Sequence, residues 1–409
     1  MKKHTLLIFC DMVRGNLLHN INKNIKKSKF DLFLENLGGT LYTNAYTPAP
    51  DTGRAYSMLQ TGLSCKKNGC DDVWKYPEFF LKEDIEILDE ILLKEDIETT
   101  YIGTKRNDLS GVFSKKVKNK ILIDFKIQTY EKSFLILNEK LKKFDKTFTW
   151  ICLDDYHVAA DDYGASMKSD DVGKEKLFNI FEKLFTVLDK NDFDEIIILS
   201  DHGNVHKYGF KDSRILNLLN DDRTKILLYR VTKKNQEFKL NNELRSILDV
   251  FPTIIESFEL QNRKVCGVSL NQKVTDERII SMESYSEFLH LSPLNLWGCR
   301  SKDYFYLTNQ NYKKMYQVRS PVDYKEINID KEEEEKFIKV LKEETVNYEV
   351  KEKELKSIER YYEVLNYHYR YSDNSERNQF NKERLKSLKV KRVPYYISVL
   401  LSKLTKRGN

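Results

Sequence analysis

Short apolar runs alternate with amphipathic segments over more than half of the chain. Because these runs have no polar face, they predict buried strands of a sheet that is covered on both sides. The predicted strands are residues 5–10, 99–102, 120–125, 148–153, 195–200 and 225–231. Between them, residues 82–94 and 174–189 carry apolar side chains at helical spacing, which predicts helices. This alternation predicts an α/β fold with a mixed, mostly parallel sheet flanked by helices.

The pattern changes near residue 330. Residues 331–336 are mostly acidic, long charged helical patterns follow, and a basic tail begins at Arg384. We therefore expect one domain over residues 1–310 and a mostly helical C-terminal region over residues 311–409. The apolar face of residues 395–404 lies beside basic residues, so this segment could dock on the protein's own core or contact anionic lipid.

Composition narrows the class of protein. With 409 residues, 40% hydrophobic and 32% charged, the chain can bury a large core. A net charge of +6 is small beside 69 basic and 63 acidic residues, so no nucleic-acid partner is expected. The six cysteines lack paired metal-site spacing and are expected to be reduced. No apolar run has the length of a signal or spanning segment, so a cytoplasmic location is expected.

Polar residues follow three of the predicted strands. Asp11, Asp154, Asp155, Asp201 and His202 all stand at strand ends, where ligands gather in open α/β sheets. A single aspartate there could equally cap a helix or form a turn. Three strands that end alike favour a shared site.

A threonine hydroxyl stands out in the segment TPAPDTGRAYSMLQTG, residues 47–62. A hydroxyl is a weak nucleophile at neutral pH, and a divalent cation is one means of activating it. Asp11, Asp201 and His202 offer the oxygen and nitrogen ligands that zinc, manganese, magnesium or calcium accepts. We expect Thr52 to join them at one metal site, with a second site possible.

The chain resembles the sulfatase-like branch of the alkaline phosphatase superfamily, which includes phosphoglycerol and phosphoethanolamine transferases. The resemblance spans roughly residues 5–309. It is carried by TPAPDTGRAYSMLQTG, LSDHGN (199–204), GTLYTNAY (39–46), LRSILDVFPTIIESFEL (244–260) and GVSL (267–270). It implies an alkaline-phosphatase-like catalytic domain over residues 1–310. It also implies that Asp11, Thr52, Asp201 and His202 form the metal and nucleophile site.

Two further candidates follow from LDDYHVAADDYG, residues 153–164. This segment resembles the family's mid-chain element, in which an Asp or His binds a second metal or contacts the leaving group. We assign Asp155 to metal binding and His157 to the leaving group. His206 could complete a second metal site or be a surface residue.

Two basic residues are candidates for substrate binding. The planar fork of Arg54 could hold ester oxygens, or Arg54 could form a surface ion pair. Lys105, in YIGTKR, resembles the substrate-binding lysine of sulfatases with its register offset by one residue.

The nucleophile segment departs from the sulfatases that use formylglycine. Their signature has a cysteine or serine, then a proline two positions later and an arginine four positions later. Here those positions hold Thr52, Arg54 and Tyr56. Threonine cannot be converted to the aldehyde hydrate, whereas it is the nucleophile in the resembling phosphodiesterases and transferases. We therefore expect attack of Thr52 on phosphorus, a phospho-threonine intermediate, and a leaving oxygen that His157 protonates.

The expected function is that of a metal-dependent phosphoric ester hydrolase or phospho-group transferase. Its substrate would be an anionic ester: a phosphorylated glycan, or a lipid-linked or nucleotide-linked precursor of surface polysaccharide. The basic tail could hold such an enzyme at the inner membrane face. The alternatives are a sulfuric ester hydrolase of the same fold, a two-metal phosphomutase or phosphomonoesterase, and a noncatalytic binding protein that kept the fold.

Overall fold

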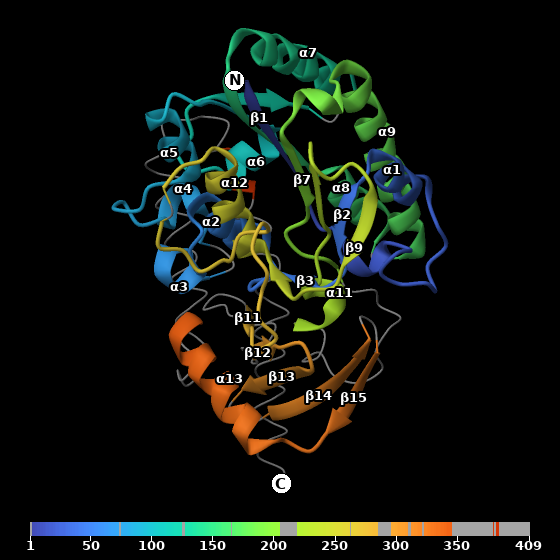
Figure 1. Ribbon diagram of the computed structural model, residues 1–409, viewed down its shortest axis with the longest axis vertical. Coiled ribbons are helices and arrows are strands. Elements are labelled where there is room, and N and C mark those ends of the chain that lie inside the picture. Colours follow the sequence, from blue (N-terminus) through green and yellow to red (C-terminus); the bar gives the residue numbers. More distant parts are fainter. Residues whose placement is uncertain are drawn as a thin grey trace. The chain divides into compact units, whose positions relative to one another are not determined.

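The computed structural model describes most of the chain up to residue 345 (Figure 1). The described residues are 2–72, 75–124, 127–164, 166–204, 219–261, 263–284, 296–309, 312–320, 323–345, 379 and 382–383. One compact unit comprises residues 1–285 and 296–348, and every element below belongs to it. His206 and the basic tail lie outside the described residues, so neither prediction can be assessed.

An eight-stranded sheet forms the centre of this unit. In spatial order its strands are β5 (Lys120–Ile123), β4 (Glu98–Thr104), β6 (Lys146–Leu153), β1 (Lys3–Cys10), β7 (Glu195–Leu199), β8 (Leu228–Thr232), β2 (Gly39–Tyr42) and β9 (Phe238–Asn241). The first five strands are parallel, β8 is antiparallel to both of its neighbours, and β9 is parallel to β2. The predicted mixed, mostly parallel sheet is confirmed. The short strands β2 and β9 were not predicted.

Helices cover both faces of the sheet (Figure 1). On one face lie α2 (Thr52–Thr61), α5 (Leu88–Lys94) and α12 (Val250–Ser257), and on the other lie α1 (Lys29–Leu37), α7 (Ile127–Lys143) and α9 (Met167–Val187). Alternate residues of β1 point to opposite faces of the sheet: Leu7 and Phe9 pack in the first core cluster, and Leu6 and Ile8 pack in the second. This double burial explains why the strands read as unbroken apolar runs.

Both predicted helices exist with shifted bounds. The helix predicted at 174–189 is the C-terminal part of α9, which begins at Met167 behind its N-cap Ser166. Of residues 82–94 only the second half is helical, because α5 begins at Leu88. Glu90 accepts a hydrogen bond from the backbone N–H of Ile87 at 3.1 Å and so fixes that start.

An antiparallel five-stranded sheet, called the second sheet below, follows the eight-stranded sheet in sequence but pairs none of its strands with it. Its strands are β11 (Ile280–Ser284), β12 (Leu296–Arg300), β13 (Tyr304–Asn309), β14 (Tyr312–Ser320) and β15 (Asp323–Ile327). Helix α13 (Lys331–Glu344) buries Phe337 and Leu341 against the face that carries Trp297 and Tyr306.

The predicted domain boundary at residue 310 needs correction. Strands β13 and β14 pair directly across it, from Tyr304 with Gln317 to Asn309 with Tyr312. Residues 312–327 are therefore mostly strand rather than helix. Their mixed lysine and tyrosine pattern has no helical period. The predicted change to helix near residue 330 does occur, since Asp330 caps α13.

Two simpler expectations concern thiols and membranes. All six cysteines are free, and all except the half-buried Cys266 are buried. None of the helices that the structure describes combines the length and apolar character needed to cross a bilayer.

Candidate active site

The register of three neighbouring parallel strands brings three carboxylates together. Strand β1 lies between β6 and β7, with Cys10 opposite Leu153 and Phe9 opposite Leu199. Continuing both registers past the strand ends places Asp11 beside Asp154 on one side and beside Asp201 on the other. A backbone hydrogen bond of 2.9 Å from Asp11 to Leu153 extends the first pairing. The strand ends therefore converge as the sequence predicts.

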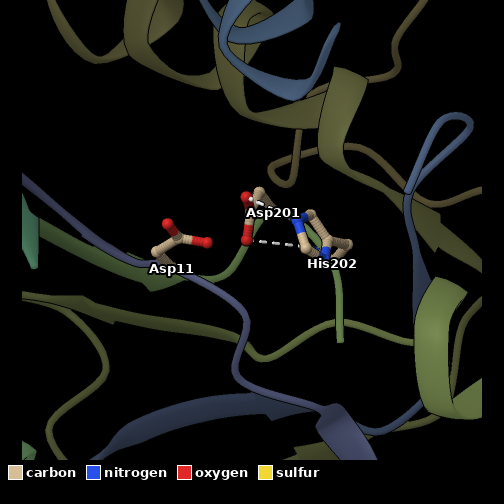
Figure 2. Close-up of side chains that lie close together, drawn as sticks. All are labelled: Asp11, Asp201 and His202. Atoms are coloured by element: carbon tan, nitrogen blue, oxygen red, sulfur yellow. Dashed lines mark hydrogen bonds and ion pairs between the residues drawn. The ribbon is translucent and has the colours of Figure 1, made fainter. Parts of the chain in front are cut away.

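Asp11, Asp201 and His202 form the candidate metal centre. Their ligand atoms all lie within 4.8 Å of one another, and all three residues are buried (Figure 2). Oδ1 of Asp11 and Oδ2 of Asp201 are buried, and within the described part of the chain neither accepts a hydrogen bond of good geometry. Buried carboxylate oxygens are rarely left without a donor. A divalent cation would satisfy both oxygens.

The imidazole of His202 is oriented for metal binding. Nδ1 lies 2.8 Å from the carbonyl oxygen of Gly203, which can only accept, so Nδ1 carries the proton. Burial lowers the pKa of His202, and the ring is neutral. The lone pair of Nε2 then faces Oδ2 of Asp201 at 3.2 Å. Two lone pairs at this distance repel unless a proton or a cation lies between them, and a metal ion would fit this donor set.

The two carboxylates have opposite electrostatic surroundings. Burial, followed by the charge of Asp11, raises the pKa of Asp201 well above its usual value. Burial also opposes ionisation of Asp11, but His157 outweighs it, and the pKa of Asp11 falls to about 2. Asp201 keeps its place because Oδ1 accepts backbone N–H groups from Met12 at 2.9 Å and from His202 at 2.8 Å. These backbone donors hold the carboxylate of Asp201 in place at the candidate metal centre.

Thr52 is the first residue of α2 and faces this centre. Its Oγ1 lies 3.4 Å from Nε2 of His202. The preceding residue, Asp51, is the N-cap and accepts a hydrogen bond from the N–H of Arg54 at 3.1 Å. The hydroxyl therefore sits where the positive end of a helix meets the candidate metal ligands, a favourable place for an anion. The structure brings the four predicted principal residues together.

His157, from α8 (Asp155–Tyr163), lies beside the metal centre. Its Nδ1 is 2.9 Å from Oδ2 of Asp11, and its Nε2 is 3.5 Å from Asp161. The charge of Asp11 raises the pKa of His157 to about 9 despite partial burial. Its imidazolium thus orients Asp11 through one N–H and has a second N–H on the side of Asp161.

Asp155 is not brought into the cluster, and its predicted role as a metal ligand needs correction. Its carboxylate accepts a hydrogen bond from the hydroxyl of Tyr130, within the second core cluster. Its neighbour Asp154 accepts from Thr104 at 2.9 Å and from Asn107 at 3.1 Å. Burial and the charge of Asp11 raise the pKa of Asp154 to about 6, so this residue, rather than Asp155, lies near the metal centre.

Arg54 is neither a surface residue nor open to substrate, so its predicted role in substrate binding also needs correction. Its side chain is 2% exposed. Nε donates to Asp51, and Nη1 lies 3.6 Å from Glu283 of β11. Two carboxylates therefore take up its charge inside the protein.

The second predicted substrate-binding residue, Lys105, is exposed and begins α6 (Lys105–Ser110). The next residue, Arg106, has a charge that acts on the pKa of both Asp11 and His157. Its guanidinium lies 3.3 Å from Asp161. Arg106, one position after Lys105, is thus a basic residue whose charge reaches the site. A role for Lys105 in substrate binding stays a prediction.

Arg223 is a candidate that the sequence did not reveal. It belongs to α11 (Asp221–Thr224), and its Nη2 donates to the carbonyl oxygen of Pro50 at 2.7 Å. Its charge lowers the pKa of His202, and its buried Nε donates no hydrogen bond to any described residue. Only the fold brings Arg223 to the nucleophile loop, because it is distant in sequence from every motif.

No protein-family model and no curated protein sequence matches the chain, but solved structures do. A protein of the alkaline phosphatase superfamily from Vibrio parahaemolyticus superposes with a TM-score of 0.61 and 12% identity, over 85% of this chain and 89% of that one. The phosphonate monoester hydrolase of Agrobacterium radiobacter gives 0.58 and 12%, over 84% and 94%. BT4656, solved with its substrate D-glucosamine-2-N,6-O-disulfate, gives 0.65 and 11%, over 84% and 97%. The chain therefore has the fold of the alkaline phosphatase superfamily and its sulfatases.

Proposed function

We propose that the protein is a metal-dependent esterase or group transferase that acts on phosphate-type esters through Thr52. The observation that carries this proposal is the position of the Thr52 hydroxyl, 3.4 Å from Nε2 of His202 in the candidate metal centre. A bound divalent cation would lower the pKa of the hydroxyl and neutralise charge on the ester. A scaffold protein would have no need for two buried carboxylate oxygens that accept no hydrogen bond of good geometry from the described residues.

The chain's own residues account for the remaining requirements of the reaction. The N-terminus of α2 and the guanidinium of Arg223 supply positive charge where the ester's anionic oxygens would lie. Oγ1 of Thr52 attacks phosphorus and loses its proton to solvent. The bond from phosphorus to the leaving oxygen breaks, and that oxygen takes a proton from His157. Water or an acceptor hydroxyl then attacks phosphorus and gives its proton to the neutral His157. The bond from phosphorus to Oγ1 breaks, and Thr52 takes up a proton from solvent.

Phosphorus is favoured over sulfur because residue 52 is threonine. A threonine side chain cannot give the aldehyde hydrate that many sulfatases use. Among proteins of similar fold, a phosphonate monoester hydrolase supports this choice, while BT4656 shows that the fold also accepts a sulfated sugar. A sulfuric ester hydrolase is therefore the second candidate.

The proposed substrate is an anionic ester with a sugar, lipid or nucleotide leaving group. Arg223 and Arg106 are two basic residues whose charges act on the candidate site, on His202 and on Asp11 respectively. A cytoplasmic location belongs to this proposal, since precursors of surface polysaccharide are made there.

The test is a metal-supplemented screen of phosphomonoesters, phosphodiesters, phosphonate esters and sulfate esters with three proteins. Wild type should turn over a phosphorus ester and, when the reaction is quenched, carry an adduct on Thr52 that peptide mass spectrometry locates. Thr52→Ala should lose at least about 100-fold in kcat, as for the loss of other covalent nucleophiles. Thr52→Ser, which keeps the hydroxyl, should retain activity.

Three outcomes would contradict the proposal. Undiminished turnover by Thr52→Ala would show that Thr52 is not the nucleophile. Turnover of sulfate esters alone would establish the second candidate, and binding of metal without turnover of any ester would favour a noncatalytic protein.

A further inference from the structure

A glutamate from the second sheet reaches the segment that carries the nucleophile. Glu283 lies in β11 and is 3% exposed. Its backbone N–H donates to the carbonyl oxygen of Pro48 at 2.8 Å, and its carboxylate lies 3.6 Å from Nη1 of Arg54. Pro48 and Arg54 flank Thr52 in sequence, so this strand contacts both sides of the nucleophile segment.

Arg54 connects Glu283 to Asp51, the N-cap of α2. Its Nε donates to one carboxylate oxygen of Asp51, and its backbone N–H donates to the other at 3.1 Å. Asp51 is the N-cap of α2, and Thr52 follows it directly. The guanidinium therefore determines how the cap is held, and the cap determines where the first turn of α2 presents the hydroxyl.

The charges in this region are balanced. The side chains of Asp51, Arg54 and Glu283 are each at most 10% exposed, and Arg223 donates to Pro50 in the same segment. Two guanidinium groups thus lie with two carboxylates. Removal of one buried charge leaves its partner uncompensated, and the remaining groups must rearrange. If Glu283 lost its charge, Asp51 would be the one described carboxylate left to pair with Arg54, at the cap beside the nucleophile.

We propose that Glu283 is a positioning residue that orients Thr52 through Arg54 and Asp51. The second sheet would then contribute to catalysis without contacting substrate. This inference rests on the proposed function of Thr52. A displacement of about 1 Å at a reacting group can lower a rate about 100-fold, so the effect should be visible in kcat.

The test is Glu283→Gln, which keeps the size of the side chain and the N–H to Pro48 but removes the charge. We expect kcat to fall roughly 10-fold to 100-fold, while KM and the affinity for metal change less than about twofold. The matched control is Glu195→Gln. Glu195 is also a strand residue with 3% exposure, and it pairs with Arg230, but it lies at the beginning of β7, at the opposite end from the site. Its loss should lower stability and leave kcat unchanged.

A second measurement does not require turnover. In a Thr52→Cys background, the alkylation rate of the introduced thiol reports where the first turn of α2 holds residue 52, because a helix N-terminus favours the thiolate. The labelled peptide can be separated by mass spectrometry from those of the six native cysteines. Glu283→Gln should change this rate at least about threefold, while Glu195→Gln should leave it unchanged.

The two hypotheses fail in different ways. If wild type turns over esters but Glu283→Gln retains both kcat and the alkylation rate, the positioning role is wrong and the proposed function stands. If no ester is turned over, the function is wrong and the alkylation rate alone decides whether Glu283 positions residue 52. If Glu195→Gln lowers kcat as much as Glu283→Gln, the effect is general destabilisation, and the inference is overturned.

Discussion

Asp11 and Asp201 are two buried carboxylates at the ends of adjacent strands, and their arrangement opposes folding when no cation is bound. The charge of Asp11 adds to burial in raising the pKa of Asp201. Two like charges in a buried site destabilise each other unless a cation or a proton intervenes. Stability is therefore given up at this candidate metal centre, as is common at functional sites.

This arrangement predicts that Asp201→Asn stabilises the metal-free protein. The amide oxygen can still accept from Met12 and His202, while the buried charge is removed. After treatment with a chelator, the variant should be more stable than wild type by about 1 kcal/mol or more in chemical denaturation near pH 7. With saturating metal the order should reverse, because ligand at 100 times Kd stabilises wild type by about 2.7 kcal/mol.

The same prediction has a pH dependence. A carboxyl group whose pKa is raised by folding contributes stability below its unfolded pKa, and that contribution is lost as pH rises through the folded pKa. The advantage of Asp201→Asn in metal-free protein should thus shrink as the pH is lowered and Asp201 takes up a proton. An advantage that is independent of pH, or no response of wild type to metal, would contradict the assignment.

Sequence alone predicted the residues that stand directly at strand ends or in the nucleophile segment. Asp11, Asp201 and His202 follow strands whose apolar runs are unmistakable, so their place at one edge of the sheet could be inferred. The directions of side chains at the beginning of a helix could not. The predicted surroundings of Asp155 and Arg54 were therefore wrong. Arg223 reaches the site through a tertiary contact that no local sequence pattern indicates.

At the scale of elements, the loop after β7 and the short helix α11 are packed so closely that only glycine fits between them. A Cβ atom at Gly203 would lie 2.0 Å from the carbonyl oxygen of Asp222 and 2.4 Å from Cγ of Arg14. The N–H of Gly203 donates to the carbonyl oxygen of Arg223 at 2.9 Å. The loop that carries His202 thus determines the position of the helix that carries Arg223.

Gly203→Ala should therefore displace α11 and weaken binding of the anionic ester. We expect KM to rise by about tenfold, equivalent to about 1.4 kcal/mol, as Arg223 moves away from Pro50. The measurement is steady-state kinetics on the ester found in the screen. Gly164→Ala is the control, since a Cβ there meets nothing within 4 Å and only its positive φ of 67° is unfavourable. An unchanged KM in Gly203→Ala would show that α11 does not serve substrate binding.

Elements were predictable where both faces are buried and less so elsewhere. Strands β1, β6 and β7 have continuous apolar runs, and their predicted positions agree closely with the structure. Strand β9 has mainly partly or fully exposed residues, and β2 has only four residues, so neither gives a strong pattern. Short edge strands form because a neighbouring strand is already in place, which a local pattern cannot show.

At the scale of the whole unit, the second sheet contacts the rest of the unit at more residues than Glu283. Tyr324 of β15 donates a hydrogen bond to Asp221 at the beginning of α11. Arg300 of β12 lies over the rings of Tyr46 and Tyr324, with ring-centroid distances of 5.0 and 4.7 Å. Buried cation–π contacts of this kind contribute about 2 kcal/mol. The second sheet therefore belongs to the same folding unit as the site.

A truncation series tests this view of the molecule. A chain that ends at residue 310 loses β14, β15 and α13, which leaves β13 as an open edge and removes the cover that Phe337 and Leu341 give to Trp297 and Tyr306. Burial of the Phe337 and Leu341 side chains contributes about 1.5–3 kcal/mol each. The chain that ends at residue 310 should therefore aggregate or unfold without cooperativity. A chain that ends at residue 348 retains the whole unit and should melt cooperatively within a few degrees of the full chain.

Circular dichroism melting and metal titration distinguish the two truncated chains, since only the longer chain should be stabilised by metal. If the shorter chain instead folds and binds metal like the full protein, β14, β15 and α13 form a separate appendage on which the site does not depend.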